Sequence, residues 1–129
     1  MQERPEKSIE QIIEEDGRYP IDAVQFVREG LNHTLSLFHP DKEPGQKQHV
    51  SGAQLCDGMR DLAQKRWGLM AQPVLQSWNI TGTRDFGEIV FLLVNSGWMQ
   101  KNDDDDVVDF DNVYDFNEAF NGEFEISLE

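Results

Sequence analysis

Apolar positions recur every three or four residues along most of the chain, which is the spacing of one face of an α-helix. The clearest stripe runs from Ile21 to Phe38, where apolar side chains step by 3, 3, 4, 4 and 3 residues. Shorter stripes with the same spacing predict further helices before and after it. We expect helices at residues 9–16, 20–38, 52–68, 73–78 and 84–96, and a last amphipathic helix that follows Val113 through Phe116, Phe120 and Phe124.

Residues at the ends of these stripes support the same boundaries. Ser8 and Ser51 are each followed three residues later by a glutamine, which is the capping-box pattern of a helix N-terminus. Gly17 and Gly97 follow the last apolar residue of their stripes and are suited to end a helix. Gly30 lies inside a stripe and costs about 1 kcal/mol relative to alanine. We therefore expect a neighbouring segment to approach the backbone closely at Gly30.

The stripe at residues 84–96 continues around the helix, because Phe91 and Leu92 lie opposite its main apolar face. A helix that is apolar on nearly all sides is expected at the centre of the core. Trp98–Lys101 and Val107–Phe110 flank an aspartate turn and predict a small β-hairpin. We therefore expect a mainly α fold of five to six helices around a central apolar helix, with a C-terminal hairpin that makes it winged-helix-like.

Length and charge limit the possible functions. With 129 residues, 38% of them hydrophobic, the chain is expected to form a single domain, residues 1–129. Its net charge of -14 argues against direct binding of nucleic acid or an anionic membrane, since both require a basic surface. The longest apolar run, Ile89–Val94, is too short for a membrane span, and the first residues resemble no signal peptide. One cysteine fits a reducing compartment, so a cytoplasmic location is expected.

Charge is concentrated at the C-terminal end of the chain. The first 101 residues carry 14 acidic and 11 basic side chains, whereas the remainder has eleven acids and no Lys or Arg. Residues 102–129 also contain Val, Phe and Tyr side chains that a disordered acidic tail would not need. We expect this segment to dock on the body and to present an acidic face to a basic partner protein. Asp109, Phe110 and Asp111 are its predicted binding residues.

Residues with catalytic or metal-binding chemistry are few. Cys56 lies near a helix N-terminus that would favour a thiolate, but its apolar neighbours favour a buried structural cysteine. No nucleotide-binding, hydrolase or zinc-protease motif is present, and neither the three histidines nor Asp103–Asp106 have the spacing of a zinc or EF-hand site. No cofactor and no metal are expected. The motif at residues 39–42, HPDK, matches the loop signature of a J-domain, but the preceding segment lacks the basic face of that domain, so an ordinary exposed turn is expected.

The segment that follows the first helix has the sequence DGRYP. Gly17 permits a left-handed turn, Asp16 can cap a helix or pair with Arg18, and Tyr19 combines a hydroxyl with an apolar ring. One interpretation is a corner between two helices with an internal salt bridge. The other is a recognition pocket in which Arg18 binds an anionic group.

Three blocks of sequence also resemble a known family. They are DGRYP at residues 16–20, HVSGxQLCxG at 49–58 and DFGEIVFxLVxxG at 85–97. In this order they resemble the Minf-type family of small conserved hypothetical proteins from planctomycete and verrucomicrobial bacteria. The resemblance covers most of the chain, from the first helix to about Phe120, and implies a shared fold. It implies no activity and no catalytic residues.

These observations favour a non-catalytic protein-interaction module that presents an acidic surface. Two alternatives remain open. The first is an enzyme that uses Cys56 or a pocket lined by Arg18. The second is a winged-helix-derived regulator of nucleic-acid machinery, which would act through a protein or imitate the phosphate backbone with its acidic tail. A deep pocket with convergent polar groups would favour the enzyme, whereas an exposed apolar or acidic surface would favour the interaction module.

Overall fold

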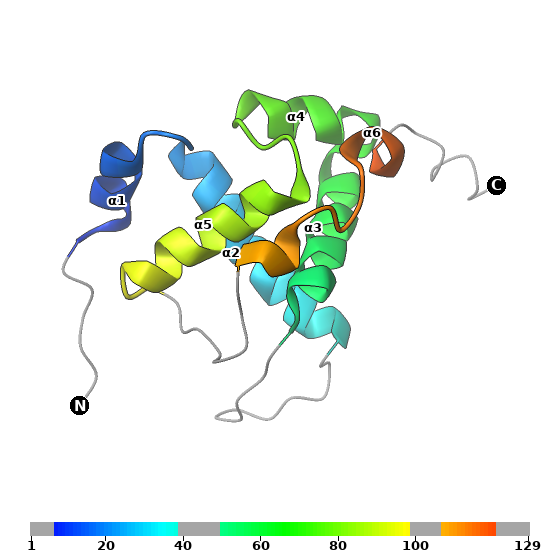
Figure 1. Ribbon diagram of the computed structural model, residues 1–129. Coiled ribbons are helices and arrows are strands. Elements are labelled where there is room, and N and C mark those ends of the chain that lie inside the picture. The colour runs from blue at the N-terminus through cyan, green and yellow to red at the C-terminus, as the bar shows by residue number, and fades with distance from the viewer. Residues whose placement is uncertain (1–6, 39–49, 99–106, 121–129) are drawn as a thin grey trace.

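The chain folds into an arrangement of helices, shown in Figure 1. The computed structural model describes residues 7–38, 50–98 and 107–120, and of Val107 only the backbone. No helix in these three ranges is both long and apolar enough to cross a membrane. The elements are α1 (Ile9–Asp16), α2 (Ile21–Phe38), α3 (Gly52–Trp67), η1 (Gly68–Met70), α4 (Ala71–Ser77), α5 (Thr83–Asn95), η2 (Val107–Phe110) and α6 (Phe116–Ala119), where η marks a 3-10 helix.

The mainly α fold is therefore confirmed, and so are most of the predicted helix boundaries. Ser8 and Ser51 both form complete capping boxes with the glutamines that follow them. Gly17 ends α1 in a left-handed conformation, with φ of 78°. Helix α4 begins two residues before Pro73, which lies in its first turn. Helix α5 begins at Thr83 and ends at Asn95, one residue earlier at each end than expected.

Helices α2 and α3 make the most extensive contact between elements. A side chain added at Gly30 of α2 would overlap the side chain of Met59 in α3. In the same way, a side chain added at Gly58 of α3 would overlap Thr34 of α2. The expected close approach at Gly30 is confirmed, and a methionine side chain fills the space.

Helix α5 packs against α2, α3 and η2. Phe86 and Ile89 on its inner side are fully buried, and the Phe86 ring centroid lies 6.5 Å from that of Phe26 in α2. Arg84 and Glu88, on another side of α5, reach the surface. The helix thus belongs to the core, as expected, but it is not buried all round.

The expected C-terminal hairpin is not seen. The chain at Val107–Phe110 forms the 3-10 helix η2 rather than a strand, and no strand occurs in the described ranges. The contacts that hold η2 on α5 include the packing of the Phe110 ring against Gly87 and the hydrogen bond that the Phe110 carbonyl accepts from the Thr83 hydroxyl. The first predicted strand and the aspartate turn lie almost entirely within residues 99–106, which are outside the described part of the chain.

The last predicted helix is shorter than its apolar pattern suggested. Helix α6 has four residues, and the Asp115 carboxylate caps it by accepting hydrogen bonds from the backbone N–H groups of Asn117 and Glu118. Phe116 and Phe120 are buried in the main hydrophobic core, so residues 107–120 pack on the body. Phe124, which extended the predicted stripe, lies outside the described residues.

Candidate functional site

The corner between α1 and α2 contains the predicted salt bridge. The backbone N–H of Arg18 donates to Asp16 Oδ2 at 3.1 Å, which closes the turn at Gly17. The guanidinium of Arg18 reaches the same carboxylate, with Nη2 at 2.8 Å from Asp16 Oδ1. The interpretation of this segment as a helix-helix corner therefore describes what is observed.

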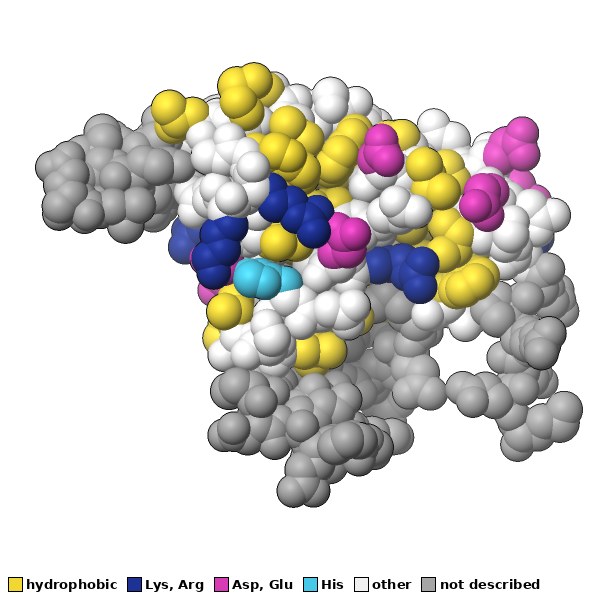
Figure 2. Space-filling view, turned by 180° about the vertical axis from the view of Figure 1, so that it is seen from behind, with side chains coloured by type: hydrophobic (Ala, Val, Ile, Leu, Met, Phe, Trp, Pro, Cys, Tyr) yellow, Lys and Arg dark blue, Asp and Glu magenta, His cyan; other side chains and the backbone are white. Residues whose placement is uncertain are grey.

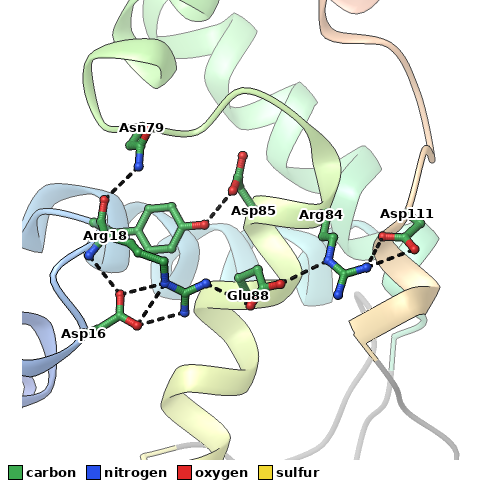
Figure 3. A network of polar contacts seen from close by, with 8 residues as sticks. Asp16, Arg18, Asn79, Arg84, Asp85, Glu88 and Asp111 are labelled. Carbon is green, nitrogen blue, oxygen red and sulfur yellow. Dashed lines mark hydrogen bonds and ion pairs between the residues drawn. The ribbon is translucent and has the colours of Figure 1, made fainter.

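Arg18 is also the first link in a longer series of ion pairs, shown in Figure 3. Its Nη1 donates to Glu88 Oε1 at 3.0 Å, and Glu88 Oε2 accepts from Arg84 Nε at 3.0 Å. Arg84 Nη1 then donates to Asp111 Oδ1 at 3.0 Å. We call Asp16, Arg18, Glu88, Arg84 and Asp111 the ion-pair chain. The ion-pair chain crosses the surface of α5. It links the predicted binding residues Asp16 and Arg18 to Asp111, which was predicted as a binding residue at a distant place in the sequence.

The charges in the ion-pair chain compensate one another. The hydrogen bonds that Arg18 donates to Asp16 and to Glu88 raise the pKa of Arg18 above its usual value. Hydrogen bonds from Arg18 and from Arg84 lower the pKa of Glu88, which is therefore ionised at neutral pH. Arg18 thus contacts two carboxylates of the fold, which compensate its charge.

Tyr19 fastens the same corner to the start of α5. Its ring is 5% exposed, and its hydroxyl donates to Asp85 Oδ1. The other oxygen of Asp85 accepts from the backbone N–H groups of Thr81 and Gly82, and this explains why α5 starts without a capping serine or threonine. Burial, reinforced by the hydrogen bond to Asp85, raises the pKa of Tyr19 above its usual value.

The three predicted binding residues of the C-terminal segment have different environments. Phe110 is 4% exposed and contributes to packing. Asp109 is exposed and its backbone lies close to Gly52 at the start of α3. Asp111 belongs to the ion-pair chain. Two of the three therefore present carboxylates at the surface, while the third anchors them.

Cys56 is fully buried, as predicted for a structural cysteine. Burial raises the pKa of its thiol to about 12, with a smaller contribution from the charge of Asp57. The backbone carbonyl of Cys56 accepts a hydrogen bond of 2.7 Å from the hydroxyl of Tyr114, which lies in the C-terminal segment. A thiol held in the protonated form and away from solvent is not suited to nucleophilic attack.

A groove lies beside the Asp111 end of the ion-pair chain. It has a volume of about 430 Å³ and is enclosed by α4, the first residues of α5 and the segment that leads into α6. Four carboxamide side chains line the groove: Gln72, Gln76, Asn112 and Asn117. The sequence pattern does not indicate them, because isolated Asn and Gln residues have no characteristic spacing. The polar and charged side chains that line the groove include Gln72, Gln76, Arg84, Asn112, Asp115 and Asn117.

In the described ranges, no group of three His, Cys, Asp or Glu side chains is placed to hold a metal ion. The HPDK motif at residues 39–42 and the aspartates at 103–106 lie outside those ranges. Comparisons with protein-family models, with curated proteins and with solved structures find no match to the chain.

Proposed function

We propose that the protein is a non-catalytic interaction module that binds a basic segment of a partner protein along its acidic C-terminal edge. We define this edge as residues 107–120, from η2 through α6. The observation that carries the proposal is that this edge combines acidic side chains, with no Lys or Arg, and buried aromatic anchors. The acids are Asp109, Asp111, Asp115 and Glu118, and the anchors are Phe110, Phe116 and Phe120.

The anchors hold the edge in a defined position. The Phe116 ring centroid lies 5.8 Å from that of Phe86 in α5 and 5.2 Å from that of Phe120. Gln64 of α3 also donates a hydrogen bond of 3.0 Å to the carbonyl of Ala119. Carboxylates carried by a fixed backbone lose little conformational freedom when a partner binds, which favours affinity.

Charge is distributed in a way that favours this edge as the contact surface. The opposite side of the molecule, over α2 and α3, carries both basic and acidic side chains, as Figure 2 shows. Several of them pair with each other there, for example Lys65 with Asp61 and Arg66 with Glu29. An edge with an excess of acidic side chains attracts a basic partner over longer distances and increases the association rate at low salt.

The resemblance to the Minf-type family supports a second, structural proposal, that the chain shares the fold of that family. The three blocks of sequence that carry it fall at the corner before α2, at the start of α3 and along α5. Two contacts link the first and third blocks directly, from Tyr19 to Asp85 and from Arg18 to Glu88.

A charge-matched pair of variants tests the proposed function. The double variant Asp109→Asn/Glu118→Gln removes two charges from the acidic edge, and Glu10→Gln/Glu14→Gln removes two exposed charges from α1. The probe is a fluorescein-labelled peptide of alternating lysine and alanine, titrated by fluorescence anisotropy at low and physiological salt. We expect the edge variant to bind several-fold more weakly than the α1 variant. Equal binding by the two variants would mean that net charge alone attracts the peptide, and the proposal would fail.

A further inference from the structure

We infer that the groove between α4, the start of α5 and the acidic edge binds the extended main chain of the partner, through its carboxamide side chains. This inference rests on the proposed function and specifies where and how the basic segment would bind. A carboxamide offers an N–H donor and a C=O acceptor, which are the two groups that every peptide unit also carries. The groove contains four of them, Gln72, Gln76, Asn112 and Asn117.

Several hydrogen-bonding groups of the groove have no partner within the described ranges. Gln72 Nε2 donates to Asn117 Oδ1 at 2.9 Å, and this bond fixes both side chains. It leaves the Gln72 oxygen as an acceptor and the Asn117 NH₂ group as a donor. The side chains of Gln76 and Asn112 form no hydrogen bond with any residue of the described ranges. The groove can therefore offer both donors and acceptors to a ligand without breaking an internal contact.

The spacing along α4 suits an extended chain. Gln72 and Gln76 are four residues apart on one helix, which separates them by about 6 Å along its axis. In an extended peptide, groups on the same side recur every second residue, at intervals of about 6.6 Å. Two successive same-side peptide units can therefore meet Gln72 and Gln76 in register.

The size and the charge of the groove limit the class of ligand that it can bind. A volume of about 430 Å³ lies in the range of sites for small ligands and accommodates a short peptide segment rather than a folded element. Arg84 at the wall is held by Glu88 and Asp111 and so is not offered to an anion. Asp115 uses Oδ1 to cap α6, and its other oxygen can accept a hydrogen bond from a cation. The fitting ligand is a short extended segment with a lysine or arginine side chain.

The experiment uses the full chain, labelled with ¹⁵N, and observes the side-chain NH₂ signals of its Asn and Gln residues by NMR. The probe is a mixture of acetylated, amidated pentapeptides with a central lysine and Ala, Val or Ser at the other positions. A second mixture carries N-methyl groups on alternate peptide bonds, which removes main-chain donors without changing charge. We expect the first mixture to shift the signals of Gln72, Gln76 and Asn117, and the methylated mixture to bind at least ten-fold more weakly.

A matched pair of variants tests whether the peptides bind at the carboxamide side chains of the groove. Gln76→Met replaces an exposed carboxamide of α4 with an apolar side chain of similar length, and Gln25→Met makes the same change at an exposed position of α2. We expect only the first variant to weaken binding, by about five- to ten-fold.

The outcomes separate this inference from the proposed function. If both peptide mixtures bind equally and the acidic-edge variant still weakens them, the proposed function stands and the inference is overturned. If the unmethylated mixture shifts no side-chain NH₂ signal of the groove, the inference is overturned as well. If neither mixture nor the lysine-alanine peptide distinguishes the edge variant from the α1 variant, both proposals fail.

Discussion

Gly87 lies where η2 packs on α5, and replacing it with alanine should destabilise the protein. A Cβ at this position would lie 2.6 Å from Cγ and Cδ1 of the Phe110 ring and 2.8 Å from its Cβ. Carbon atoms in contact prefer separations of about 3.5–4.0 Å, so the ring would have to move by about 1 Å. Overpacking of this kind costs about 1–3 kcal/mol, whereas alanine stabilises a helix by about 1 kcal/mol relative to glycine. We expect a net loss of about 1 kcal/mol in the free energy of unfolding.

A double-mutant cycle with Phe110→Ala isolates the contact, and urea denaturation followed by circular dichroism measures it. Removing the buried ring should by itself cost about 3–5 kcal/mol. Phe110→Ala removes Cγ and Cδ1 of the ring but keeps the Cβ of residue 110, which would lie 2.8 Å from the new methyl group. In that background Gly87→Ala should therefore cost clearly less than in the wild type, because only the Cβ contact remains of the three closest ones. The reasoning is refuted if Gly87→Ala stabilises the full-length protein, or if it destabilises both backgrounds equally.

Three further predictions concern single groups. Glu88→Gln should reduce stability at neutral pH. The folded-state pKa of Glu88 is lowered, so its contribution is present above the unfolded value of 4.5 and lost as the pH falls through the folded value. The stability gap between the wild type and this variant, measured by urea denaturation, should therefore narrow in acid; a constant gap would contradict the ion-pair account. Thr83→Val should cost about 1–3 kcal/mol in thermal or urea unfolding, because the Thr83 hydroxyl bonds the Phe110 carbonyl and the Val113 N–H, while Thr83→Ser should retain most of the stability. Cys56 should react with a thiol reagent only as fast as the protein unfolds; rapid modification of the native protein would disprove its burial.

The parts of the structure that were predictable are those determined by neighbouring residues. The capping boxes at Ser8 and Ser51 were identified correctly because a cap and its partner lie three residues apart. The Asp16–Arg18 pair was anticipated for the same reason. The pair between Arg18 and Glu88 joins residues 70 positions apart, and side chains at that separation leave no pattern in a single sequence.

The segment at Val107–Phe110 shows why a short apolar stretch can mislead. Its four residues are compatible with an edge strand or with one turn of 3-10 helix, and intrinsic propensity does not separate the two. The tertiary contacts decide, since Thr83 binds the Phe110 carbonyl and Gly87 makes room for the ring. Val108 is left exposed on the outer side. These contacts depend on residues more than twenty positions away, which the local pattern does not reveal.

The ion-pair chain also has a consequence for how long the folded protein survives. Its links from Arg18 to Glu88 and from Arg84 to Asp111 close loops of 70 and 27 residues, whereas α2 and α3 are successive helices that can meet early. Loops of this length cost entropy before their contacts stabilise the chain, so such contacts tend to form late in folding. Interactions that are absent from the folding transition state act mainly on the unfolding rate. Loss of the Glu88 charge should therefore leave the refolding time nearly unchanged and shorten the lifetime of the native state.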